Sequence, residues 1–268
     1  MKPIITKTLI LFTLVQIAAL FAGLKFTEQH VSVVENSASA DNSFYLFATI
    51  VAFAVILLII LKLYKGKLLF LLLELAMTFT AMQLFGSLFA GGITPTLFAI
   101  AAVILRLAIP QAQQPILLAT VAIVGGLLGS SLDIVPAAIL AILLAIYDVI
   151  AVFYTKHMVA LAKELTNRQA AFSLKITVEK DKLELGTGDI VIPAMLIVAA
   201  NRIGKTAFEI SGSTVSIAAI FGIIGAVIGI AALLFYLEKR KGYWPALPPI
   251  TAGTIGGILI ATYLTTLL

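Results

Sequence analysis

The stretch "LELGTGDIVIP", residues 183–193, sets an aspartate at the junction between a glycine-containing turn and an apolar run. Asp189 follows Gly186 and Gly188 and leads directly into isoleucine and valine residues. If that run crosses a membrane, a carboxylate inside it costs at least ~2.5–3.5 kcal/mol even on an insertion scale. The position of Asp189 therefore needs a reason, and the rest of the sequence supplies it.

The composition is that of a membrane protein. The 268 residues are 61% hydrophobic and 12% charged, with a mean hydropathy of +1.13. A soluble globular domain does not need so much apolar surface. The net charge of +5 does not indicate nucleic-acid binding, because the basic residues lie in loops between apolar runs. The chain has no cysteine, which excludes disulfides, thiol nucleophiles and cysteine-ligated metals.

The apolar runs predict an all-α polytopic membrane protein with nine transmembrane helices. Most runs have the ~17–25 residues that a helix needs to cross ~30 Å of hydrocarbon, although the seventh is shorter. The first is interpreted as a retained span, since no small-x-small cleavage pattern follows it. The predicted spans are Ile4–Leu24, Phe44–Leu63, Leu68–Phe89, Ala90–Ile109, Ile116–Leu132, Ile134–Phe153, Asp189–Ala200, Val215–Leu237 and Ala246–Leu268.

The distribution of basic residues predicts the orientation of these spans. Fifteen of the 18 lysines and arginines fall on the face that holds the N-terminus, and only Lys25, Arg202 and Lys205 fall on the other. Under the positive-inside rule this count predicts a cytoplasmic N-terminus and an outward-facing C-terminus. We therefore expect a multi-pass protein of the cell membrane.

The chain divides into a six-helix part (1–153), an inner loop (154–187) and a three-helix part (188–268). Within the loop, residues 158–172 have apolar residues at helical spacing and are expected to lie along the membrane interface. Alternating apolar and polar residues on both sides of "EKDK" (179–182) predict a short β-hairpin before helix 7. Small residues in the last two spans predict close helix packing: Gly225, Gly229, Gly253, Gly256 and Gly257.

Three acids fall within spans, and two of them lie at a similar depth. Asp148 is eight residues before Lys156, or roughly 12 Å below the inner surface, and Asp189 is seven residues after Lys182, or about 10 Å deep. Neighbouring helices pack about 8–10 Å apart, so these two carboxylates can meet. The third acid, Glu74, is interpreted as structural.

The short seventh span has an explanation in this scheme. A helix that begins about 10 Å deep needs few residues to complete the crossing. The preceding "LGTG" (185–188) is then non-helical backbone at membrane depth, which is tolerated only when buried in protein or lining a wet cavity. Water would reach Asp189 there. Capping of the seventh helix is an alternative reason for this aspartate.

The available chemistry points to a pair of aspartates. An H-E-x-x-H zinc site is absent, and the two histidines, His30 and His157, lie outside the spans, so a serine nucleophile lacks its usual base. Two carboxylates a few ångströms apart do not ionise together, so they share a proton. One then takes a proton from water while the other polarises a peptide carbonyl.

Three short motifs resemble those of a known family. "YD" (147–148), "GTGD" (186–189) and "PAL" (245–247) look like the signatures of the presenilin and signal-peptide-peptidase family of GxGD intramembrane aspartyl proteases. Thr187 stands where the family usually has leucine. The predicted orientation and the short loops are most similar to a prokaryotic (archaeal) presenilin homologue. The resemblance implies a presenilin-like fold and an aspartic endopeptidase in which Asp148 and Asp189 are catalytic.

The same resemblance implies that single-span membrane proteins are the substrates, and that the site opens toward the cytoplasmic side. We expect the strand "KLEL" (182–185) to pair with an unwound substrate by β-addition, with the "PAL" loop on the other side. No cofactor, metal, nucleic acid or obligate partner is expected, and homo-oligomer formation is left open. The predicted substrate-binding residues are Tyr147, Leu183, Leu185, Gly186, Gly188, Pro245, Ala246 and Leu247.

Simpler roles exist for some of these residues, because Pro245 suits the first turn of a helix and Tyr147 suits ordinary packing. An alternative function also exists. An ion-coupled or proton-coupled transporter, or a cation leak protein, places acids at depth beside broken helices. Against it stand the lack of an inverted repeat and the predicted hairpin next to Asp189.

Overall fold

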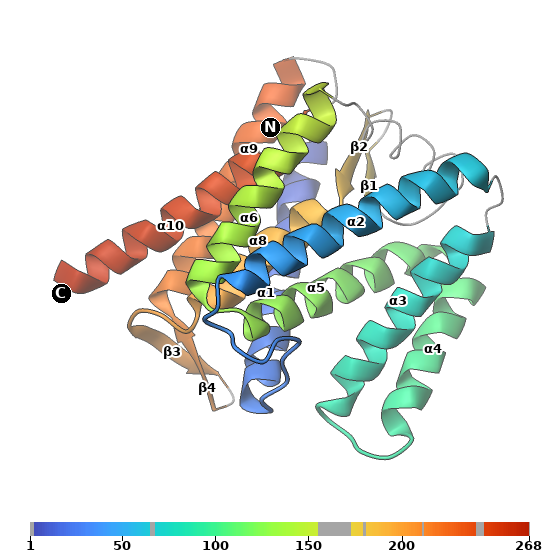
Figure 1. Cartoon of the computed structure of the whole chain (residues 1–268), viewed down its shortest axis with the longest axis horizontal. Helices are drawn as coiled ribbons and strands as arrows, with labels where there is room; N and C mark the ends of the chain where they lie inside the picture. Colours follow the sequence, from blue (N-terminus) through green and yellow to red (C-terminus); the bar gives the residue numbers. More distant parts are fainter. Residues whose placement is uncertain are drawn as a thin grey trace.

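The computed structural model describes residues 3–64, 68–154, 173–178, 181–210, 212–239 and 244–267, and helices dominate it (Figure 1). Each predicted span corresponds to an apolar helix. Within these ranges, seven helices are long and apolar enough to cross a membrane, and two shorter apolar helices are α4 and α8. The helices are α1 (Pro3–Glu28), α2 (Asp41–Leu63), α3 (Leu68–Ser87), α4 (Thr94–Ala108), α5 (Gln113–Ser131), α6 (Ile134–Val149), α8 (Gly188–Ala200), α9 (Ile217–Lys239) and α10 (Leu247–Leu267).

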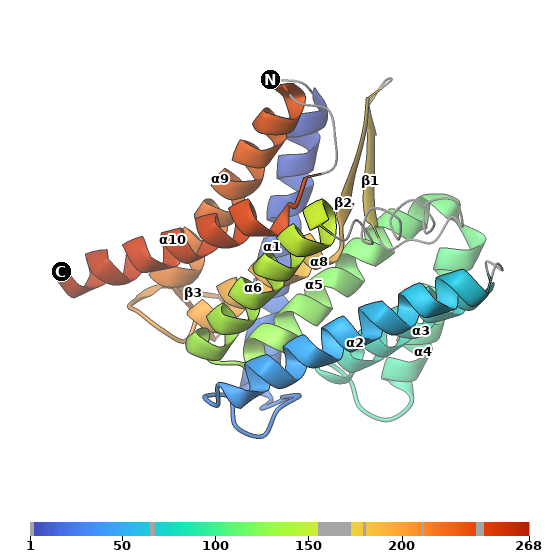
Figure 2. The ribbon, with the colours of Figure 1, turned by 45° about the horizontal axis from the view of Figure 1, so that its top comes forward.

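Helix α8 lies at the centre of the bundle. It packs against α1, α5, α6, α9 and α10, and every residue from Ile192 to Ala200 is buried. A helix that is apolar on all sides has no face that prefers water, so burial on all sides suits it. Around this centre, α3 and α4 form a hairpin on one side, and α9 and α10 lie on the opposite side (Figures 1 and 2).

Glycines allow the central helices to approach closely. A Cβ added at Gly225 or Gly257 of the α9–α10 pair would collide with the backbone of the facing helix, and the same holds for Gly229 and Gly253. The predicted close packing is confirmed at these four positions, whereas Gly256 has no such neighbour within 4 Å. The sequence reading missed a second set of close contacts, in which Gly125, Gly126 and Gly129 of α5 meet α1 and α8.

Two antiparallel β-hairpins flank α8, one before its start and one beyond its end. The first pairs β1 (Ser173–Val178) with β2 (Asp181–Gly186), which confirms the predicted hairpin before this helix. The second pairs β3 (Thr206–Ile210) with β4 (Ser213–Ser216) and was not predicted. The segment 158–172, predicted to be amphipathic, lies outside the described residues.

The predicted starts of the fourth and eighth spans are wrong. The fourth helix begins at Thr94 and not at Ala90, because Gly91 and Gly92 belong to a turn in which Gly92 has a φ of +67°. That left-handed conformation suits glycine. The eighth predicted span began at Val215, but this residue belongs to β4 and the helix begins at Ile217.

Candidate active site

The first aspartate lies near the end of α6. Asp148 is one residue before the last residue of this helix, and a π-helical segment, η2 (Ile150–Tyr154), follows directly. A π-helical turn carries one extra residue, so it changes the direction of the side chains around it, and such turns are frequent at functional sites. The sequence reading gave no sign of this irregularity.

The second aspartate lies in the first turn of α8. The helix begins at Gly188 with Thr187 at the N-cap position, so Asp189 is inside the helix and the alternative that it caps the helix is wrong. A carboxylate in a first turn is favoured by the helix dipole. A Cβ added at Gly186 would lie 3.0 Å from the Asp189 carboxylate oxygen Oδ2, so the end of β2 passes close to this aspartate.

Helices α6 and α8 bring the two aspartates together. The helices are in contact, and the carboxyl groups of Asp148 and Asp189 are close enough to interact electrostatically. Asp148 and Asp189 are both partly buried, in a bundle whose centre is apolar. The predicted meeting of these two acids is therefore what the structure has.

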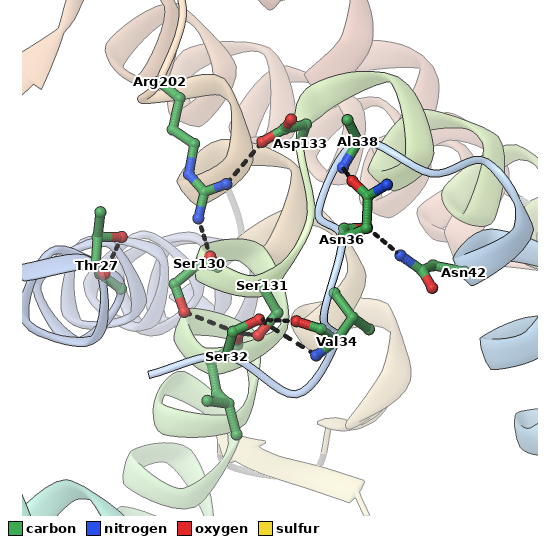
Figure 3. Close-up of polar contacts among 12 residues, drawn as sticks. Thr27, Ser32, Val34, Asn36, Ala38, Asn42, Ser130, Ser131, Asp133 and Arg202 are labelled. Carbon is green, nitrogen blue, oxygen red and sulfur yellow. Dashed lines mark hydrogen bonds and ion pairs between the residues drawn. The ribbon is translucent and has the colours of Figure 1, made fainter. Parts of the chain in front are cut away.

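An ion pair at the opposite end of these helices explains why the depths match. Arg202, just beyond α8, pairs with Asp133, just before α6, at 2.7 Å (Figure 3). The Arg202 guanidinium also donates to the Ser130 carbonyl. Asp148 lies fifteen residues after Asp133 and Asp189 thirteen before Arg202. These separations correspond to about 22 and 20 Å of helix, so both aspartates lie at nearly the same distance from the ion pair.

The "PAL" segment contacts the first aspartate through its backbone. Leu247 begins α10, and its N–H donates to Asp148 Oδ2 at 3.2 Å. Pro245, Ala246 and Leu247 are all buried. Pro245 precedes the helix by two residues, so it does not occupy the first turn. A backbone N–H can hold a carboxylate oxygen in a fixed direction whatever side chain follows.

An aromatic cluster that the sequence reading missed supports this segment. The Trp244 ring packs edge-on against Phe153 of η2 at 5.2 Å and against Tyr236 of α9 at 4.7 Å between ring centroids. These contacts join the chain after Asp148 to the chain before Pro245. The only signal in the sequence was the single tryptophan next to "PAL".

The backbone direction of β2 follows from one hydrogen bond. The Lys175 N–H donates to Gln114 Oε1 at 3.1 Å and therefore points away from β2. Lys175 is opposite Glu184, so this is a non-hydrogen-bonded pair, and the backbone groups of Glu184 point away from β1. The backbone groups of Gly186, two residues further along β2, also point away from β1. The backbone of Leu183 and Leu185 points toward β1 instead.

The other predicted site residues lie in different surroundings. Leu185 is buried in the core, and Leu183 packs partly buried against it. The Tyr147 ring packs edge-on against Phe47 of α2 at 6.3 Å, which is consistent with ordinary packing. Gly188 is exposed. Their predicted roles in substrate binding stay predictions.

The third membrane acid belongs to a different part of the bundle. Glu74 of α3 accepts a hydrogen bond from Arg106 Nε of α4 at 2.5 Å, and both side chains are largely buried. Helix α3 packs on α4 and α5, away from the two aspartates. This buried ion pair agrees with a structural role for Glu74. Within the described ranges, no group of three or more histidines, aspartates or glutamates could hold a metal ion.

Two carboxyl groups on neighbouring apolar helices are an arrangement that an aspartyl protease working inside a membrane would need. The chain matches the family described as "Signal-peptide peptidase, presenilin aspartyl protease" over residues 9–267. It belongs to this family, and it is an intramembrane aspartyl protease, an aspartic endopeptidase.

Solved structures agree on the fold. The chain is similar to a presenilin family intramembrane aspartate protease in space group C222, with 24% identity over 97% of this chain and 99% of that one and a TM-score of 0.72. A P2 structure with the corresponding description gives 21% identity, 94% and 96% coverage, and a TM-score of 0.67. No curated protein sequence matches the chain. Nothing in these comparisons supports the transporter alternative.

Proposed function

We propose that Asp148 and Asp189 are the catalytic pair of this protease, and that it hydrolyses peptide bonds within or near the membrane helix of single-span proteins. The observation that carries the proposal is the interaction of the two carboxyl groups from α6 and α8 inside an apolar bundle. Ionising both members of a neighbouring carboxyl pair is unfavourable, so in this mechanism the pair shares one proton. One carboxylate and one carboxylic acid are then available together.

The chemistry uses each member of the pair twice. The carboxylate takes a proton from a water molecule as the water oxygen attacks the peptide carbonyl carbon, and the carboxylic acid donates its proton to the carbonyl oxygen. The tetrahedral intermediate collapses when the first aspartate passes the proton it took from water to the peptide nitrogen and the C–N bond breaks, while the second takes back a proton from a hydroxyl of the intermediate, which restores the starting pair. The Leu247 N–H keeps Asp148 Oδ2 in place during these steps.

In our proposal, the segment of the substrate that is cleaved binds as an extended strand. A helical peptide bond is engaged in its own hydrogen bonds, so the substrate must unwind before water attacks. The edge of β2 that faces away from β1 carries the backbone of Glu184 and runs toward Asp189, which lies against Gly186 at the end of the strand. A strand added along this edge by β-augmentation would bring a peptide bond to the catalytic pair.

The apolar surface next to Asp148 supports approach from the lipid. A groove of about 410 Å³ lies between α6 and α10, lined by Ile146 and Val149 on one helix and by Pro248 and Thr251 on the other. It contacts the helices that carry Asp148 and the "PAL" segment, so an apolar substrate helix in this groove would lie next to the site. We also propose nine crossings, a cytoplasmic N-terminus and a site opening toward the cytoplasm, on the distribution of lysine and arginine.

The test is cleavage of a labelled single-span substrate by the purified protein in detergent. We expect product from wild type, and a fall of at least about a thousandfold in Asp148→Ala and in Asp189→Ala, because neither residue can act without the other. Thermal unfolding of each variant controls for loss of fold. Undiminished cleavage by either variant would contradict the two-aspartate mechanism.

A further inference from the structure

A buried glutamine lies next to the helix turn that carries Asp189. Gln16 is in the middle of α1, and its side chain is fully buried, with 0% exposure. A polar amide in an apolar bundle is unfavourable unless it has a partner. The Gln16 Nε2 donates to the carbonyl oxygen of Ile190 at 3.3 Å. Ile190 is the residue directly after Asp189.

Close packing of α1 against α8 fixes this contact in space. Gln16 meets Ile190, and seven residues further along α1 a Cβ at Gly23 would collide with Val198 of α8. The two helices therefore run side by side in the same direction. Gly126 of α5 approaches the carbonyl oxygen of Ala19 at the same interface. These close contacts fix the position of α1 along the axis of α8. Gln16 therefore stays beside the first turn of α8.

The first turn of α8 needs support from outside the helix. Pro193 lies inside the helix and has no N–H, so the Asp189 carbonyl oxygen does not receive the usual hydrogen bond from the residue four positions later. The turn is also preceded by Gly186 and Gly188, which add backbone freedom. The aspartate thus lies on a turn of α8 that lacks one of its internal hydrogen bonds.

We propose that Gln16 is a positioning residue for Asp189. It bonds the first turn of α8 from a neighbouring helix and so holds the carboxyl group in the orientation that the pair needs. A catalytic group displaced by about 1 Å loses up to about a hundredfold in rate, so a single tether of this kind has a measurable effect. This inference rests on the proposed catalytic role of Asp189.

The oxygen of the Gln16 amide makes it possible to distinguish a role in positioning from a role in stability. Gln16 Oε1 is buried and has no hydrogen-bond partner among the described residues. Methionine has nearly the same shape and buries no such polar atom, so Gln16→Met is expected to leave the melting temperature unchanged or raise it. A residue that served only stability would not give this result together with lower activity.

The experiment measures kcat, KM and melting temperature on a labelled single-span substrate in detergent. We expect Gln16→Met to lower kcat about tenfold with KM unchanged, because the loss concerns the orientation of Asp189 and not substrate binding. Thr13→Val is the matched control, since the Thr13 hydroxyl bonds only the Leu9 carbonyl within α1 at 2.8 Å. It should keep the kcat of wild type.

A second background tests the reason for the tether. Pro193→Ala restores an N–H toward the Asp189 carbonyl, so in that background Gln16→Met should lower kcat only about twofold. An unchanged kcat in Gln16→Met, a fall in kcat matched by lost melting temperature, a rise in KM alone, or equal losses in both backgrounds overturns the proposal. Asp189→Ala is measured alongside. If that variant stays active, the proposed function fails, whereas failure of Gln16→Met alone overturns only this inference.

Discussion

The two β-hairpins that flank α8 differ in what holds them. Beyond the end of the helix, β3–β4 is tied down by side chains: Asn201 Nδ2 donates to the Thr214 carbonyl at 2.9 Å, and Asn201 Oδ1 accepts from the Ser216 N–H at 2.8 Å. Ser213 also bonds Glu28 of α1. Before the helix, β1–β2 is anchored through β1 to Gln114, and the other edge of β2 points toward Asp189.

The difference shows how one helix end is fixed while the other stays available. Hydrogen bonds and the Asp133–Arg202 ion pair hold α6, α8 and α9 together at the end away from the aspartates. The ion pair therefore ties α6 to the end of α8 far from the two aspartates. The hairpin before α8 packs into the core through Leu174, Ile176 and Leu185, and in our proposal its outer edge presents backbone groups to a substrate.

Of the substitutions that compare the two hairpins, the largest effect is expected at the edge of β2. Glu184→Pro removes an N–H that points away from β1, so the hairpin keeps its ladder while an added strand loses a partner and meets the proline ring. We expect cleavage to fall about a hundredfold with little change in melting temperature. Glu184→Ala keeps the N–H and controls for the loss of the side chain with its contacts, so it should retain far more activity than Glu184→Pro. Equal losses in both variants would argue against strand addition at this edge.

At the other hairpin we expect an effect on stability and not on chemistry. Asn201→Ala removes two hydrogen bonds to β4 and should lower the free energy of unfolding by about 2 kcal/mol. Asn201→Asp keeps the acceptor for the Ser216 N–H and should cost less. Chemical denaturation in detergent measures both, and kcat per folded molecule should not change. A fall in kcat at full stability would mean that this hairpin contributes to the site.

The smallest effect belongs to the ion pair. Asp133 and Arg202 are 40% and 30% exposed in their side chains, so water screens much of their attraction. We expect Arg202→Met to lower the free energy of unfolding by about 0.5–1 kcal/mol, and Asp133→Asn to add little in the double variant. Because the pair also sets helix register, cleavage should fall by about twofold in Arg202→Met. Independent, additive losses from the two substitutions would show that the residues do not act as a pair.

Much of the architecture could be predicted because the membrane imposes it. The lengths of the apolar runs predicted the helices. The residue counts from Lys156 and Lys182 predicted that Asp148 and Asp189 lie at a similar depth in the membrane. Strand alternation predicted the hairpin before α8. The hairpin after α8 was missed, since the predicted eighth span began inside its second strand, at Val215, and the alternation of residues 206–214 was not interpreted.

The sequence by itself determined which residues can carry the chemistry. A carboxylate inside an apolar span is costly, so Asp148 and Asp189 stand out without any knowledge of their neighbours. Only the tertiary structure decided what holds them: the Leu247 N–H, the Trp244 cluster, the Arg202 ion pair and Gln16. The physical reason is that each of these contacts joins helices far apart in the chain. Such contacts depend on how glycine-lined helices pack against one another, so neither the hydrophobic periodicity nor a short sequence motif predicts them.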